Sequence, residues 1–155
     1  MSRIRRVCVN VIALGILATV AACSGASGPG ATMDPGFTGH WTSTEWGEHY
    51  ILVRGNTVKI IYAHDNGRFI GTLVGSAANG WWTETPSRRP PADAGDVTFT
   101  LIDSGNTRTI DGRWRYGTEG GVRENWDLTW VDAAIPADIQ AKFDEDSAFI
   151  ARPEA

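Results

Sequence analysis

The chain has little cysteine, no excess of basic residues and no apolar run of membrane-spanning length. Its two cysteines among 155 residues cannot build a disulfide framework. The 18 acidic residues outnumber the 14 basic ones, which gives a net charge of −4. Because a nucleic-acid-binding protein needs a basic face, nucleic acid is excluded as an expected partner. The remaining composition, 42% hydrophobic and 21% charged, is typical of one globular domain.

The first 23 residues have the layout of a secretory signal peptide. Arg3, Arg5 and Arg6 precede an apolar run over residues 7–20. That run is shorter than the roughly 20 residues that a transmembrane helix needs. It ends in small residues and a cysteine, in the order Val20-Ala21-Ala22-Cys23.

This ending resembles the lipobox of bacterial lipoproteins. The resemblance implies cleavage before Cys23, a diacylglyceryl thioether on its sulfur and N-acylation with a fatty acid such as palmitate. Because two or more acyl chains anchor a protein stably, we expect the mature protein to sit at the cell membrane, on its extracytoplasmic side. The alternative is an ordinary signal peptide that leaves Cys23 free. Cys8 is lost with the signal peptide in either case.

Lipidation of Cys23 would leave the folded domain without a thiol. That excludes disulfides, thiolate metal sites and a cysteine nucleophile. Glycine, serine, alanine and proline dominate the segment after the cysteine, which predicts a flexible linker. The sequence is therefore divided into a signal peptide at 1–22, a lipidated linker at 23–36, a β-barrel domain at 37–131 and a C-terminal helix and tail at 132–155.

Short apolar runs between glycine and asparagine turns predict an all-β domain. Short connections favour antiparallel pairing of neighbouring strands, and closure removes exposed edges. We therefore expect an eight-stranded antiparallel up-and-down barrel. Its predicted strands cover residues 38–46, 48–54, 57–63, 68–75, 79–85, 96–103, 107–116 and 123–131.

Alternation at period two assigns the two faces of each strand. Ile110, Gly112 and Trp114 share one face, and Asp111 and Arg113 share the other. Glycines inside predicted strands favour a tight barrel over a flat sandwich, because they let a sheet coil beside a neighbouring Trp. A repeat of Gly39-His40-Trp41-Thr42 at Gly80-Trp81-Trp82-Thr83 supports two four-stranded halves.

The pattern changes after residue 131 to apolar residues at helical spacing. Pro136 suits the first turn of a helix, and Ile135, Ile139 and Phe143 recur every four residues. This predicts an amphipathic helix near 136–150 that packs on the outside or at one end of the barrel. Three adjacent acidic residues near its C-terminal end oppose the helix dipole, so we expect fraying there.

Catalytic motifs are few. The sequence has no nucleophile elbow, phosphate-binding glycine loop or zinc-protease motif, so no catalytic residue, metal ligand or cofactor is assigned. His40 and His49 are expected to approach one another across the first hairpin. Glu84 shares a face with Trp82, and its burial would make it a candidate acid.

Seven tryptophans all lie in the predicted strand region. Trp81 and Trp82 are adjacent and must point to opposite faces. With Trp82 inside, Trp81 is expected outside as a candidate anchor for a ligand or partner. The loop at 86–94 carries Arg88 and Arg89 between prolines, and it is read either as a stiff solvated connection or as a recognition loop.

The Gly-x-Trp at Gly39–Trp41, at the start of an eight-strand meander with a helix after it, resembles the lipocalin and avidin group of small-molecule-binding barrels. That resemblance implies an arginine over the first tryptophan, for which Arg113, Arg115 and Arg123 are candidates. The strand region is also similar to uncharacterised Gly/Trp-rich domains of bacterial secreted proteins. Lysozyme-inhibitor lipoproteins are similar small β barrels, although this chain lacks their Ser-Gly-x-x-Tyr element.

We therefore expect a membrane-anchored, non-catalytic binding module for a small hydrophobic molecule or a glycan. The expected ligand-binding residues are Trp41, Trp82, Trp114, Tyr116, Trp81, Arg88 and Arg89. In the alternative, the inward tryptophans only fill the core and the protein binds a protein partner or acts as an inhibitor. A hydrolase of unknown class is the residual alternative.

Overall fold

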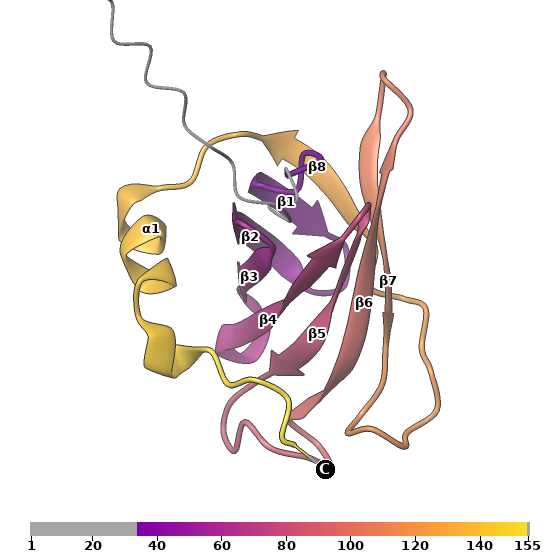
Figure 1. The fold of residues 1–155 in the computed structure, drawn as a ribbon, viewed down its shortest axis with the longest axis vertical. Helices are drawn as coiled ribbons and strands as arrows, with labels where there is room; N and C mark the ends of the chain where they lie inside the picture. Colours follow the sequence, from indigo (N-terminus) through magenta and orange to yellow (C-terminus); the bar gives the residue numbers. More distant parts are fainter. Residues whose placement is uncertain (1–33, 155) are drawn as a thin grey trace, which may run out of the picture.

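The computed structural model describes residues 34–154, and these form an antiparallel β barrel with a helix on its outside (Figure 1). Each strand pairs with the next, and the last pairs with the first, so the eight strands close the barrel in chain order. The predicted fold is confirmed. The strands are β1 (Gly39–Ser43), β2 (Gly47–Arg54), β3 (Thr57–Tyr62), β4 (Gly67–Val74), β5 (Ala77–Thr83), β6 (Ala94–Asp103), β7 (Arg108–Trp114) and β8 (Leu128–Asp132).

The barrel interior is a packed apolar core. Side chains alternate between buried and exposed along β6 and β7, as the period-two pattern predicts. Ile110 and Trp114 point inward, whereas Asp111 and Arg113 face solvent. The inward set includes Trp41, Ile51, Val58, Ile60, Phe69, Leu73, Trp82, Val97, Phe99, Leu101, Trp126 and Leu128.

Gly112 shows why the strand glycines favour a barrel. A Cβ atom built on Gly112 would lie 2.3 Å from the carbonyl oxygen of Trp126 and 2.9 Å from the ring of Phe99. Contacts under 3 Å are not tolerated, so only glycine lets these neighbours approach. The glycine therefore provides the space that a Trp needs inside a narrow barrel.

The two ends of the barrel differ in their connections. Tight turns of two to four residues join β2 to β3, β4 to β5 and β6 to β7 at one end. The connections after β1, β3, β5 and β7 meet at the opposite end, because neighbouring strands run antiparallel. They include the two longest in the barrel, at residues 84–93 and 115–127. The predicted strand at 123–131 is therefore too long, since β8 starts only at Leu128.

The C-terminal helix lies on the outer face of the sheet (Figure 1). α1 spans Ala137–Phe143, and a 3₁₀ turn follows at Asp146–Ala148. Phe143 and Phe149 pack with Ile61 of β3 in a second apolar cluster. The predicted helix at 136–150 is too long. The observed helix ends at Phe143, directly before the acidic residues, because carboxylates are unfavourable at the negative C-terminal end of a helix dipole. Instead Asp144 and Asp146 accept hydrogen bonds from Arg54 and Lys59 of the sheet.

The chain enters the barrel through a turn held by Asp34. Its carboxylate accepts hydrogen bonds from the backbone N–H groups of Gly36, Phe37 and Thr38. The C-terminal end of the predicted 23–36 linker is thus part of the folded domain. The predicted signal peptide and Cys23 lie outside the described residues. Within 34–154, no helix has the length and apolar character needed to cross a bilayer.

Candidate functional site

A cavity of about 410 Å³ opens at the end of the barrel where the long connections meet. All four connections at this end contribute a side chain or a strand-end residue to its wall. We call this cavity the barrel mouth. Its aromatic wall is formed by Trp46, Trp82, Trp114, Tyr116 and Trp126, and its polar wall by His64, Asp65, Glu84 and Asp93.

The mouth tryptophans are fixed by hydrogen bonds from their indole N–H groups. Trp46 donates to the Asn125 carbonyl at 3.1 Å, and Trp114 donates to the Asn125 side chain at 3.0 Å. Trp82 donates to the carbonyl of Arg115 at 3.0 Å. The fourth, Trp126, donates to a histidine nitrogen. An indole has only this one donor, so none of the four rings has a free hydrogen-bond donor. Trp82, Trp114 and Trp126 are at most 3% exposed, so the half-buried Trp46 and Tyr116 supply most of the accessible aromatic surface.

The rings also hold one another edge to face. Trp114 makes such contacts with Trp46, Trp82, Tyr116 and Trp126, at centroid distances between 5.1 and 5.9 Å. Edge-to-face pairs of this kind add to the stabilisation from burial. The aromatic wall is thus preformed and does not depend on a ligand to order it.

Glu84 is the buried carboxyl group of the mouth. Its side chain is only 8% exposed, and Oε1 accepts a hydrogen bond of 2.9 Å from the Tyr62 hydroxyl. Burial raises the pKa of the Glu84 carboxyl above its usual range, and the nearby Asp65 and Asp93 act in the same direction. The Tyr62 hydrogen bond and His64 oppose this shift. Glu84 therefore holds its proton more readily than an ordinary glutamate.

His64 and Asp65 stand beside Glu84 on the connection between β3 and β4. The ligand atoms of these three side chains all lie within 4.8 Å of one another, a spacing that suits a divalent metal ion bound by one imidazole and two carboxylates. The same proximity pairs a buried carboxyl group with a second carboxylate, which is the arrangement used in acid–base hydrolysis. The backbone carbonyl of Asp65 accepts bonds from the N–H and hydroxyl of Thr85, so this loop is tied to the next.

His49 lies behind the mouth and is completely buried. Its Nδ1 donates to the Gly47 carbonyl at 2.8 Å, so Nε2 is the unprotonated nitrogen that accepts the bond from Trp126 at 3.0 Å. The imidazole also stacks on Tyr62, with ring centroids 5.2 Å apart. Burial lowers the pKa of His49 to about 4, which keeps the ring neutral. This neutral imidazole positions Trp126.

Three of the predicted ligand-binding residues, Trp82, Trp114 and Tyr116, do line the mouth. Trp41 does not, because its side chain is completely buried and its N–H donates to the Phe37 carbonyl at 2.8 Å. Trp41 also contacts Trp130 edge to face. The prediction that Trp41 would line a cavity is therefore wrong.

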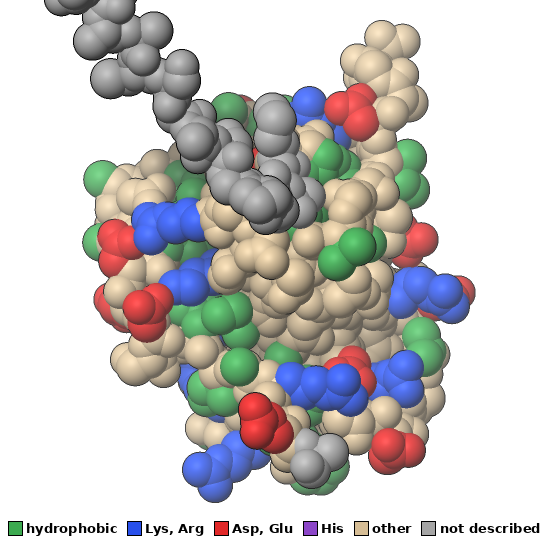
Figure 2. All heavy atoms as spheres, viewed as in Figure 1, with side chains coloured by type: hydrophobic (Ala, Val, Ile, Leu, Met, Phe, Trp, Pro, Cys, Tyr) green, Lys and Arg blue, Asp and Glu red, His purple; other side chains and the backbone are tan. Residues whose placement is uncertain are grey.

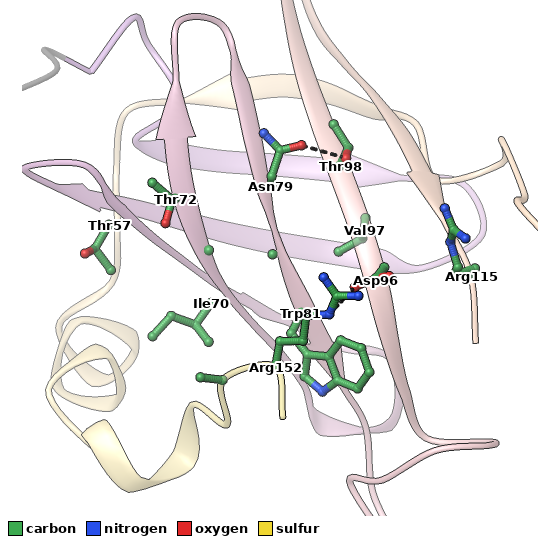
Figure 3. Close-up of a pocket in the computed structure, with 13 residues that line it drawn as sticks. Thr57, Ile70, Thr72, Asn79, Trp81, Asp96, Val97, Thr98, Arg115 and Arg152 are labelled. Atoms are coloured by element: carbon green, nitrogen blue, oxygen red, sulfur yellow. Dashed lines mark hydrogen bonds and ion pairs between the residues drawn. The ribbon is translucent and has the colours of Figure 1, made fainter. Parts of the chain in front are cut away.

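Trp81 points to the outer face, as its parity predicts, but it is only 2% exposed. Residues 151–154 of the C-terminal segment line the same outer hollows as Trp81, and Figure 3 shows Arg152 next to it. Arg152 lies between Trp81 and Asp96, and its Nε is 3.2 Å from an Asp96 carboxylate oxygen. The expectation of an exposed tryptophan is wrong, because a segment 70 residues further along the chain covers it.

The outer face also carries a groove of about 630 Å³ beside Trp81, which Figure 3 shows across strands β4 to β6. Its polar groups are largely paired with each other: Thr98 donates to Asn79 at 2.8 Å, and Arg152 pairs with Asp96. The mouth differs because several rings and carboxyl groups converge on one space. We therefore take the mouth as the functional site.

The arginines of the 86–94 loop do not line the mouth. Arg88 folds back to donate to the Thr83 hydroxyl and the Asn66 carbonyl, and Arg89 is exposed. Instead, Glu84 and Asp93 at the two ends of the connection face the cavity. The 84–93 connection therefore contributes acidic rather than basic side chains to the mouth.

The arginine expected over Trp41 lies elsewhere. Of the candidates, Arg123 lies 5.0 Å from the ring centroids of both Trp114 and Tyr116. Arg108 instead stands over Trp130, the ring that contacts Trp41. Arg113 is exposed on the outer face.

The expected approach of His40 and His49 is also wrong. His40 is opposite Tyr50 in the β1–β2 register, whereas Trp41 is opposite His49, so the two histidines lie on opposite faces of the sheet. His40 pairs with Glu48 on the outside. The sequence analysis named Glu84 as a candidate acid because it shares a strand face with Trp82. It did not place the other polar residues at the mouth. These, and the ring residues that it missed, lie on the connections or just before β8: Trp46, His64, Asp65, Asp93 and Trp126.

The fold and the mouth define the class of this protein, a closed eight-stranded antiparallel β barrel with an aromatic and acidic opening at its long-loop end. Comparison of the chain with protein-family models, with curated proteins and with solved structures found no match. The geometry and chemistry of the site itself therefore indicate the function.

Proposed function

We propose that this protein is a membrane-anchored extracytoplasmic lipoprotein whose barrel binds a small ligand at its mouth without catalysis. The observation that carries the binding role is the preformed aromatic wall, in which four indole rings converge on one cavity. Concave sites with aromatic walls and a few convergent polar groups are typical of small-molecule binding. The sequence around Cys23 supports the membrane anchor.

The surface fits a ligand other than a polyanion. Figure 2 shows acidic and basic side chains interspersed on the viewed face, with no continuous basic patch. The net charge of the chain is negative. Both features disfavour nucleic acid as a ligand.

The experiment is a tryptophan fluorescence titration of residues 24–155, which keep the complete closed barrel. A cooperative thermal unfolding transition first establishes that this chain is folded. The titrants are hydrophobic small molecules, oligosaccharides and small amines. A saturable change in emission is expected with at least one class, because ligand contact alters the environment of the mouth rings.

A matched pair of variants locates the signal. Trp46 is half-buried at the mouth, so Trp46→Leu should reduce affinity about tenfold or more. Trp130→Leu removes another half-buried tryptophan outside the mouth and should leave affinity within a factor of two. Equal loss in both variants, or no response to any class, would contradict binding at the mouth.

A protein-interaction or inhibitor role is the second candidate. One basis for this role was the expectation of an exposed Trp81. In the structure Trp81 is buried next to the C-terminal segment, so this basis is lost. The residual hydrolase reading is favoured by one observation, the buried Glu84 carboxyl group close to Asp65. Release of chromophore from nitrophenyl glycosides or esters, lost in Glu84→Gln, would support that reading over simple binding.

A further inference from the structure

We propose that the ligand of the barrel mouth is a small organic cation, an amine or a quaternary ammonium compound, held between the aromatic wall and Glu84. This inference rests on the proposed binding function and names the ligand class for the same site. It follows from three features of the mouth: the aromatic surface that its rings present, the sign of its charges and the lack of a lysine or arginine partner for those charges.

The accessible part of the aromatic wall belongs mainly to the half-buried Trp46 and Tyr116, because the other three rings are at most 3% exposed. Each of the four indole N–H groups already donates to a protein acceptor, so a ligand finds no indole donor there. Ring faces attract cations through their quadrupole, and desolvated sites strengthen that attraction. A neutral sugar or lipid would gain stacking from this wall but no hydrogen bond from its tryptophans.

The charges of the mouth are negative. Asp65, Glu84 and Asp93 line the cavity together, and the one basic side chain of this wall is His64, whose Nε2 lies 3.5 Å from a carboxylate oxygen of Asp65. Within residues 34–154, no lysine or arginine forms an ion pair with any of these three carboxylates. A mostly buried carboxylate that has no lysine or arginine partner would be stabilised by a cationic ligand bound beside it.

The protein already places one cation on this aromatic surface. The Arg123 guanidinium lies 5.0 Å from the ring centroids of Trp114 and Tyr116. Arg123 is exposed and comes from the 115–127 connection. Arg123 does not line the cavity, but its positive charge would repel a ligand cation bound there, so removal of Arg123 should strengthen binding of a cation and weaken binding of an anion.

The test compares choline with its neutral isostere 3,3-dimethylbutan-1-ol, both titrated by tryptophan fluorescence against residues 24–155. The two probes have the same shape and differ in charge. We expect choline or tetramethylammonium to bind at least tenfold more tightly than the neutral alcohol. Equal binding of the two probes would overturn the inference, although it would leave the proposed binding function intact.

Two charge variants give a signature of opposite sign. Glu84→Gln keeps the acceptor for the Tyr62 hydroxyl and removes the charge, and it should weaken choline binding about tenfold. Arg123→Gln should strengthen it at least twofold. Asp111→Asn, an exposed carboxylate on the outer face of β7, is the matched control and should change affinity by less than a factor of two.

The pH profile gives a further readout. The groups that face Glu84 are Tyr62 from β3, His64 and Asp65 from the next connection, and Asp93 from the 84–93 connection. Choline affinity should fall as acidification protonates Glu84. The profile is repeated in His64→Gln, where the fall should persist.

A divalent cation supplies the competing outcome. Zn²⁺ alone is titrated under the same conditions, because His64, Asp65 and Glu84 have metal-ligand spacing. Tight Zn²⁺ binding that is lost in His64→Gln, together with no choline binding, would overturn the inference in favour of a metal site. Absence of binding by any probe, including the wider ligand panel, would contradict the proposed function itself.

Discussion

At the scale of single residues, His49 links the mouth to the stability of the barrel. Its neutral imidazole accepts a buried hydrogen bond from Trp126 and donates a partly buried one to Gly47. A second proton on the ring would remove the acceptor and place a charge in the core. The buried neutral state therefore makes folding dependent on pH.

The first prediction is a loss of stability between pH 6.5 and about pH 4. The pKa of His49 falls from 6.5 to about 4 on folding, so the unfolded chain binds the proton over this range and the folded chain does not. The stability is fully present above pH 6.5 and is lost as the pH falls toward 4. The full effect is roughly 3 kcal/mol of unfolding free energy, measured by urea unfolding at a series of pH values.

The control for this prediction is His49→Gln, which retains an amide oxygen for the Trp126 N–H. This variant should unfold with a shallower pH dependence over the same range. The raised pKa of Glu84 acts in the opposite sense, because it favours the folded state as the pH falls toward the carboxyl range. A wild-type profile without a slope between pH 6.5 and 5, or an equal slope in the variant, would contradict the assignment to His49.

At the scale of elements, the C-terminal segment completes the outer face of the barrel. Lys59 of β3 donates to the Phe143 carbonyl at the end of α1 and to Asp146 of the 3₁₀ turn. Its ammonium also lies 4.5 Å from the centroid of the Phe149 ring. These contacts direct the remaining chain across the sheet to Trp81.

The second prediction concerns this cover. A chain that ends after residue 150 should expose Trp81, with a red shift of tryptophan emission and stronger quenching by acrylamide. The loss of buried indole surface should lower the unfolding free energy by about 1–2 kcal/mol. The same truncation in a Trp81→Phe background should lack the added quenching. Unchanged quenching of the truncated chain would mean that the segment does not cover Trp81.

At the scale of the whole molecule, the barrel has one closed end and one open end. Tight turns and the packed core seal the first, whereas the long connections leave the aromatic mouth at the second. A lipid on Cys23 would tether this barrel to the membrane through the segment before Asp34. The mouth would then face the extracytoplasmic compartment or the membrane surface itself. Small ligands in either place could reach it.

The third prediction tests the anchor. In a bacterial host, the wild-type chain should fractionate with membranes, and its N-terminal peptide should carry the mass of a diacylglyceryl and acyl modification on Cys23. Cys23→Ser should remove the modification and shift the protein out of the membrane fraction. Cys8→Ser is the matched control and should leave both unchanged. A Cys23→Ser protein that still fractionates with membranes would contradict lipid anchoring.

The sequence by itself determined the number of strands, their order and, where the alternation is clear, as along residues 97–101 and 110–116, their inward face. These follow from local properties: turn residues stop a strand, and period-two alternation selects the side chains that meet the core. Trp82, Trp114 and Tyr116 were placed at the cavity in this way, because each sits at or next to the end of an inward-facing row. Parity likewise set Trp81 on the outer face.

Only the tertiary structure decided what surrounds those side chains. The mouth exists because barrel closure brings four separate connections to one end, so that Glu84 meets Tyr62 and His49 meets Trp126, 77 residues further along the chain. The cover over Trp81 depends on where the C-terminal segment lies after α1. Contacts of this kind depend on how distant segments pack against each other, and alternation along one strand carries no information about them.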